Sequence, residues 1–150
     1  DDVPAYPEAV QAILAADLIV AGPGSLYTSV IPNLLVRDIA AAVRASRAVK
    51  VYVCNVATQP GETDGYSVLD HVKALEQHAG EGLFPIVVAN DGQVGELLPG
   101  LGWVKLDPPL NGSRRMIVAD VDQPDKPWRH DSTKLANLLI KLIEENLVTL

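Results

Sequence analysis

Gly22-Pro23-Gly24-Ser25-Leu26-Tyr27-Thr28-Ser29 follows a short apolar run at residues 17–21 and precedes a long helical pattern. At such a strand-to-helix turn glycine lets the backbone approach a ligand, and the free N–H groups face negative charge. The stretch therefore predicts an anion site with phosphate as its ligand, and Gly24 is expected to need a positive φ. It lacks the lysine of a Walker loop and the third glycine of a dinucleotide fingerprint. The alternative is a tight turn in which Ser25 only caps the helix.

Apolar runs and helical patterns alternate along the rest of the chain. The runs at residues 17–21, 49–54 and 84–89 predict strands. Helices are expected from Pro7, from Pro32 to about Arg47, from Ser67 to about Gly80 and from Asp131 or Ser132. This order predicts a mostly parallel, Rossmann-like α/β sheet with helices on both faces.

Residues 90–127 are less regular than the rest. The runs Trp103–Leu106 and Met116–Ala119 predict either edge strands or covering segments. For Asn90-Asp91-Gly92 a surface turn is favoured over a role in ligand binding.

Length and composition exclude several classes of protein. A chain of 150 residues, 48% of them hydrophobic, predicts a single globular α/β domain or half-domain over residues 1–150. The net charge of −7 argues against nucleic-acid binding, which needs clustered lysine and arginine. The single cysteine, Cys54, excludes an internal disulfide and indicates a buried strand residue. Without a membrane-length apolar run or a signal-peptide pattern, a cytoplasmic location is expected.

The three predicted strands end at Gly22, Asn55 and Asn90, each followed by polar or flexible residues. Ligands of open α/β sheets bind beyond these carboxyl ends. The loop after the second strand is longer than is usual, which leaves a functional role and a plain surface loop evenly balanced. The predicted ligand-binding residues at these two turns are Gly22, Gly24, Ser25, Leu26, Tyr27, Thr28, Asn55, Thr58, Gln59 and Glu62, and those of the long loop are expected to border the same crevice as Ser25.

Arg129 is the predicted cationic contact. A cation at a helix amino terminus faces the positive end of the helix dipole, which is unfavourable unless an anion shares the site. Arg129 therefore suggests a bound phosphate. The alternatives are that it pairs with Asp131 or a nearby glutamate, or that it projects into water. His130 is interpreted as a packing or turn residue.

Other polar residues predict neither catalysis nor a metal site. Glu62 and Asp64 are typical of a solvated acidic turn. His71 and His78 lie two helical turns apart without a third ligand and are expected to be surface or partly buried residues. Tyr27 could stack on a ring or merely pack.

Three long motifs resemble a known family. They are GPGSLYTSVIPNLLV at residues 22–36, VYVCNVATQPGETDGYSVLDH at residues 51–71 and RHDSTKLA at residues 129–136. Together they resemble the YvcK-type gluconeogenesis factors of bacteria, which are related to the CofD 2-phospho-L-lactate transferases. The resemblance covers most of the chain but only the carboxyl-terminal half of such a protein, so the amino-terminal half is expected to be missing.

The resemblance implies a nucleotide-sugar-binding regulator without established catalysis, linked to gluconeogenic growth and cell shape. It implies a UDP-sugar such as UDP-N-acetylglucosamine as ligand, Arg129 as one of its contacts, and self-association into a homo-oligomer. Two alternatives remain. One is a CofD-like transferase of a phosphorylated group that uses the glycine loop and Arg129. The other is a structural half-domain that binds no ligand on its own.

Overall fold

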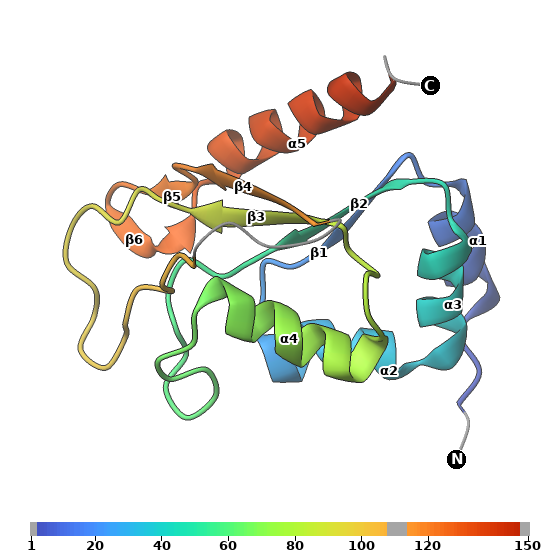
Figure 1. The fold of residues 1–150 in the computed structure, drawn as a ribbon, viewed down its shortest axis with the longest axis horizontal. Helices are drawn as coiled ribbons and strands as arrows, with labels where there is room; N and C mark the ends of the chain where they lie inside the picture. Colours follow the sequence, from blue (N-terminus) through green and yellow to red (C-terminus); the bar gives the residue numbers. More distant parts are fainter. Residues whose placement is uncertain (1–2, 108–113, 148–150) are drawn as a thin grey trace.

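A four-stranded parallel sheet forms the centre of the molecule (Figure 1). The computed structural model describes residues 3–107 and 114–147. The strands are β1 (Leu18–Ala21), β2 (Val49–Val53), β3 (Ile86–Asn90) and β4 (Arg115–Ala119), and they lie in the order β1-β2-β3-β4. Each strand is parallel to its neighbour. The predicted parallel α/β fold is confirmed.

Helices cover both faces of the sheet, but unequally. One face carries α1 (Pro7–Ala15), η1 (Leu26–Val30), α2 (Ile31–Leu35), α3 (Arg37–Ala45) and α4 (Val68–Ala79), whereas α5 (Ser132–Leu147) lies across the other (Figure 1). Crossovers between parallel strands share one hand, so a sheet whose strands follow in sequential order has its connecting helices on one side. The helix α5 connects no two strands of this sheet, so it can lie on the other face.

Alternating strand residues supply the two cores. Tyr52 and Cys54 of the second strand region point toward the helices η1 to α4, whereas Val51 and Val53 point toward α5. The side chains of all four are at most 2% exposed. A strand buried on both faces reads as a continuous apolar run, which is why this one could be recognised in the sequence.

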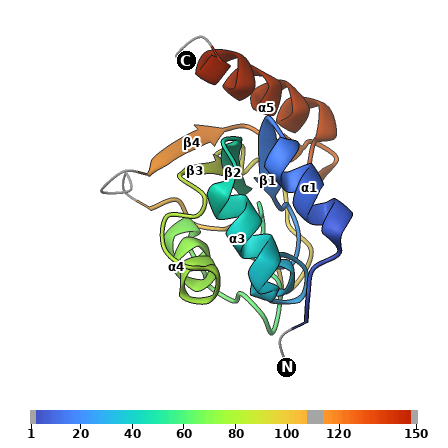
Figure 2. The same cartoon turned by 90° about the vertical axis from the view of Figure 1, so that its right-hand side faces the viewer.

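The helix expected from Pro32 differs from the observed one. The helical conformation begins earlier, at Leu26, and breaks at Val36, whose ψ of 110° is extended. Segments Leu26–Leu35 and Arg37–Ala45 meet at 80°. This bend lets α3 turn and pack along α1. Figure 2 shows the two helices next to each other, beside β1.

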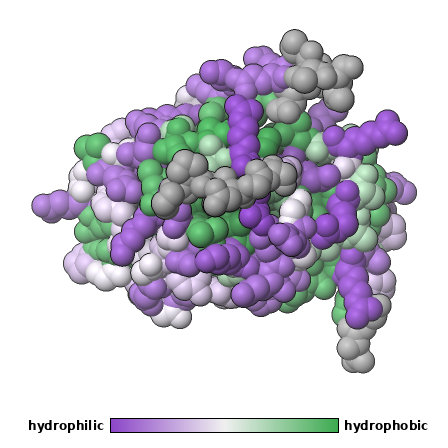
Figure 3. Space-filling view, in the orientation of Figure 1, coloured by the Kyte–Doolittle hydropathy of each residue, from purple (hydrophilic) through white to green (hydrophobic). Residues whose placement is uncertain are grey.

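Within the described residues no single helix is long and apolar enough to cross a membrane, although this bent pair meets the requirement jointly. Figure 3 shows hydrophilic and hydrophobic residues interspersed over one face of the molecule.

The irregular region contains one strand of the main sheet and a separate hairpin. Met116–Ala119 belongs to β4, whereas Trp103 and Lys105 form only isolated bridges. The hairpin consists of β5 (Asp122–Gln123) and β6 (Lys126–His130), which are antiparallel. It leads directly into α5, where the Asp131 carboxylate accepts the N–H groups of Thr133 and Lys134 and so caps the helix.

Candidate functional site

A crevice of about 550 Å³ opens at the carboxyl ends of β1 and β2. We call one side the strand-end wall; it consists of Pro23, Gly24, Ser25 and residues 55–59. We call the opposite side the hairpin wall; it consists of Trp128, Arg129 and His130, with Leu101 beside them. The structure thus brings Ser25 together with Asn55, Thr58 and Gln59 of the long loop, as expected, but Glu62, which was expected there too, does not line the crevice.

Gly22, rather than Gly24, is the position in this loop that requires glycine. Its φ is +83°, and a Cβ there would lie 2.7 Å from the carbonyl oxygen of Val53. Gly24 has no positive φ, and a Cβ there would lie at an ordinary 3.6 Å from the Cβ of Ser29. The expectation of a positive φ at Gly24 is wrong, because the sharp reversal after β1 is completed one residue after the strand.

Asn55 clamps the glycine loop. Its Oδ1 accepts the N–H of Gly24 at 3.2 Å, and its Nδ2 donates to the carbonyl of Gly24 at 3.0 Å. This reciprocal pair resembles the bonding between two strands, and it extends the contact between β1 and β2 beyond the sheet. The Asn55 side chain is thus used to hold the loop in place.

The Glu62 carboxylate occupies part of the predicted anion position. Its Oε1 accepts the N–H of Tyr27 at 3.0 Å and the hydroxyl of Ser25 at 2.7 Å. The Ser25 Oγ in turn accepts the N–H of Thr28 at 3.1 Å. A carboxylate at the beginning of a helix is stabilised by the same dipole that would attract a phosphate. Glu62 bonds Ser25 but is not among the residues that line the crevice.

The five amides from Gly24 to Thr28 divide into two groups. Those of Gly24, Tyr27 and Thr28 have acceptors within the protein. For Ser25 and Leu26 no acceptor occurs among residues 3–107 and 114–147. The structure therefore leaves two amides, rather than a full cradle, for an external anion.

Several other predicted residues pack inside the protein. The Leu26 side chain is fully buried in the core. Tyr27 hydrogen-bonds the hydroxyl of Tyr66 at 3.0 Å and packs edge-on against His78. The hydrogen bond to Tyr66 and burial raise the pKa of Tyr27 to about 12. Thr58 is 4% exposed, and its Oγ1 bonds the backbone of Gly102.

The structure thus separates the predicted residues into two sets. Gathered around the crevice are Gly24, Ser25, Asn55, Thr58, Gln59 and Arg129. Outside its lining are Gly22, Leu26, Tyr27, Thr28 and Glu62. Gly22 lines a neighbouring groove of about 480 Å³, whose other residues come mainly from β1 and the helices α1 to α3.

Arg129 lies in β6 and not at the start of a helix, so the prediction from the helix dipole is corrected. The observed N-cap of α5 is Asp131, which suits the dipole. Arg129 nevertheless lines the crevice and is exposed. Its guanidinium has neither a hydrogen bond nor an ion pair within the part of the chain that the structure describes. An anion in the crevice could therefore reach its guanidinium.

Apart from Arg129, sequence reasoning missed the hairpin wall. His130 anchors it, because its Nε2 lies 3.1 Å from the carbonyl oxygen of Cys54 at the end of β2. Burial lowers the pKa of His130, which favours the neutral ring with the proton on Nε2. The signal that could have revealed the hairpin is Pro124-Asp125, a typical turn pair between two short extended runs.

His71 is more deeply buried than predicted. Its ring is 0% exposed, its Nδ1 lies 2.8 Å from the carbonyl oxygen of Ser67, and Tyr66 packs edge-on against it. Its Nε2 has no partner among the described residues. Burial lowers the pKa of this histidine as well. Within the same residues no group of three or more His, Cys, Asp or Glu is arranged to hold a metal ion.

Comparison with known proteins places this chain in a family. The model of the 2-phospho-L-lactate transferase CofD family matches residues 1–148. The chain is 45% identical to a putative gluconeogenesis factor of a Nostoc species over 92% of its length, and 39% identical to the gluconeogenesis factor of Bacillus subtilis over 97%. These alignments cover 33% and 49% of the two relatives, so the chain spans between a third and a half of their length.

A solved structure is similar as well. A protein of the UPF0052 family from Bacillus halodurans superposes with a TM-score of 0.83 at 35% identity. The match covers 93% of this chain and 48% of the other protein.

Proposed function

The chain belongs to the CofD family, and we propose that, as part of a YvcK-type gluconeogenesis factor, it binds a nucleotide sugar of the UDP-sugar type in the crevice between the strand-end wall and the hairpin wall. The observation that carries this proposal is the exposed guanidinium of Arg129, which lines a crevice at the carboxyl ends of parallel strands.

The shape and chemistry of the crevice support a ligand of this kind. Its volume of about 550 Å³ lies within the range of small-molecule sites. A planar guanidinium can grip two phosphate oxygens at once. The half-buried indole of Trp128 offers a surface for a base or sugar ring. The backbone amide of Ser25 and the side-chain amide of Gln59 supply polar contacts on the strand-end wall.

The regulatory role rests on the names of the relatives. Proteins called gluconeogenesis factors match nearly the whole chain, and this supports a role in carbon metabolism. A contribution to cell shape, self-association into a homo-oligomer and completion of the site by a further half of the protein are parts of the same proposal. Ligand binding would couple the supply of an activated sugar to that role.

Calorimetric titration with UDP-N-acetylglucosamine tests the site, both in this chain and in a full-length relative. Arg129→Ala should weaken binding about 10- to 150-fold, the range of a charge-assisted hydrogen bond. Arg129→Lys should restore part of the affinity, because a point charge lacks the planar fork. Lys126→Ala is the matched control, since it removes an exposed cation of the same strand that does not line the crevice.

Two outcomes would count against this proposal. Equal affinity of wild type and Arg129→Ala at the same salt concentration would remove Arg129 from the site. Conversion of the added ligand, rather than simple binding, would support the competing function of a transferase, which the name of the matching family model favours.

A further inference from the structure

We propose that Asn90 is a positioning residue for the crevice: it fixes the β5–β6 hairpin to the end of β3 and thereby holds Arg129 in place. The effect on ligand affinity rests on the proposed function. The effect on the hairpin itself does not.

Asn90 is the last residue of β3, and its side chain is 5% exposed. Its Nδ2 donates to the Asp122 carboxylate at 3.1 Å, and its Oδ1 accepts the N–H of Val121 at 3.0 Å. One buried amide therefore holds two consecutive residues at the beginning of the hairpin. A third bond, from the N–H of Gly92 at 3.3 Å, fixes the turn after β3 to the same oxygen.

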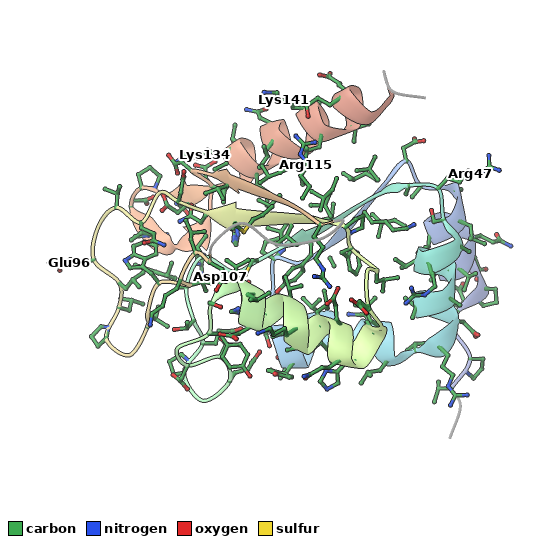
Figure 4. All side chains as sticks on the ribbon, viewed as in Figure 1. Arg47, Glu96, Asp107, Arg115, Lys134 and Lys141 are labelled. Carbon is green, nitrogen blue, oxygen red and sulfur yellow. The ribbon has the colours of Figure 1, made fainter. Side chains whose placement is uncertain are left out.

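Asp122 has a charged partner on its other side. Its side chain is almost fully buried, and the ammonium group of Lys134 lies 4.0 Å from its Oδ1. The Lys134 Nζ also donates to the Asp120 carboxylate at 2.6 Å and to the Asp122 carbonyl at 2.9 Å. Figure 4 shows Lys134 at the start of α5, beside the hairpin. A buried carboxylate is tolerated only when it is paired and hydrogen-bonded, so Asn90 and Lys134 act together.

The packing around this carboxylate leaves no spare room. A Cβ at Gly92 would lie 2.5 Å from the Asp122 Oδ2 and 2.9 Å from the Asp120 Oδ1. The turn after β3 and the hairpin thus touch directly at this point. A methyl group at Gly92 would push the Asp122 carboxylate away from the Asn90 amide.

The network reaches Arg129 through the hairpin backbone. Asp122 is paired with His130, the residue after Arg129. The N–H of Asp131 donates to the carbonyl of Val121 at 2.8 Å, which closes the base of the hairpin. The strand pairing and this bond both involve the two residues that Asn90 holds. Beyond this network, the His130 bond to Cys54 ties the same segment to β2.

The test combines hydrogen exchange with a double-mutant cycle. Asn90→Ala should speed exchange of the Asp131 amide at least about 10-fold, while amides of the β2–β3 ladder keep their protection. Asn137→Ala, an exposed asparagine of α5, is the matched control. Gly92→Ala and Lys134→Met attack the same carboxylate from other sides and should loosen the same amide, which keeps the test valid if Asn90→Ala fails to fold.

The affinity cycle separates positioning from general damage. Asn90→Ala should weaken binding of UDP-N-acetylglucosamine about 5- to 50-fold in wild type but less than about 2-fold in Arg129→Ala, because Asn90 acts through Arg129. Additive losses, or an Asp131 amide that exchanges at the wild-type rate in folded Asn90→Ala, would overturn the inference. If Asn90→Ala does not fold, an unchanged Asp131 amide in Gly92→Ala and Lys134→Met would overturn it. If the wild type fails to bind this ligand, the proposed function fails, while the exchange measurement still decides whether Asn90 holds the hairpin.

Discussion

The two walls of the crevice use their polar groups in opposite ways. On the strand-end wall, the side chains of Asn55 and Thr58 bond to neighbouring loops, and Glu62, which does not line the crevice, bonds the glycine loop. On the hairpin wall, His130 and the buried network at Asn90 supply the anchorage, and Arg129 remains exposed. Polar residues after a strand can thus be required to shape a loop, while the cation that faces the crevice comes from another element.

The glycine loop shows the same division at the level of the backbone. Gly22 provides the reversal after β1, and the Glu62 carboxylate accepts an amide that a phosphate could otherwise bind. An internal carboxylate is a permanent ligand that keeps the loop formed when the crevice is empty. The strand-end wall is therefore expected to contribute mainly to stability, and the hairpin wall mainly to affinity.

The largest expected effect on stability comes from Gly22→Ala. A Cβ at this residue would meet the Val53 carbonyl at 2.7 Å, and the backbone has a positive φ. We expect a loss of about 3 kcal/mol in the free energy of unfolding, measured by urea denaturation. Gly24→Ala should cost less than about 1 kcal/mol, since its new Cβ has ordinary contacts. Equal losses at the two glycines would contradict the assignment of the reversal to Gly22.

Asn55→Ala is expected to have the next largest effect. It removes the acceptor of the Gly24 N–H and the donor to the Gly24 carbonyl. The loss should cost about 2 kcal/mol in the free energy of unfolding. Asn33→Ala is the matched control, because that exposed side chain makes one bond, to the Ser29 carbonyl. If Asn55→Ala leaves stability unchanged but abolishes ligand binding, the strand-end wall contributes to affinity after all.

Much of the fold could be predicted because its signals are local. Apolar runs marked β1, β2 and β3, and Ser67 with Asp70 forms the capping box that begins α4. The break at Val36 could not be predicted, because no glycine or proline lies beside it to mark the end of a helix. Beyond the bend α3 packs against α1, and this tertiary contact cannot be read from the local sequence.

The site could be predicted only in outline. The carboxyl ends of β1 and β2 follow from the chain order, so the meeting of Ser25 with the long loop was predictable. The partners of Glu62 and Asn55 were not, since a loop sequence does not reveal whether a carboxylate faces a ligand or a neighbouring amide. Arg129 was placed near the crevice, although its position in β6 contradicts the dipole argument that led to it.

A change of pH compares the hairpin wall with the helix α4 through one buried histidine in each. Burial lowers the pKa of both His71, in α4, and His130, in the hairpin wall. Below about pH 6.5 these histidines bind protons in the unfolded chain but stay neutral in the folded protein. The free energy of unfolding therefore falls as the pH decreases toward the folded pKa values. The slope is at most about 1.4 kcal/mol per pH unit for each histidine.

Substituting one histidine at a time gives the contribution of each to the pH dependence of stability. His71→Phe should flatten the decline between pH 6.5 and pH 5 more than His130→Phe, because the His71 ring is fully buried and its Nε2 has no partner among the described residues. Urea denaturation across this range measures the slopes. A profile that stays unchanged in His71→Phe would show that this histidine does not titrate on unfolding.

The smallest expected effect on stability is that of Arg129→Ala. Within the described part of the chain its guanidinium has no hydrogen bond or ion pair, and the side chain is exposed. Removing such a side chain should change the free energy of unfolding by less than about 0.5 kcal/mol. His130→Ala, the adjacent residue of the same strand, should cost clearly more because it loses the Cys54 carbonyl. A loss in Arg129→Ala as large as that in His130→Ala would mean that the guanidinium supports the hairpin, and its availability for a ligand would then have to be abandoned.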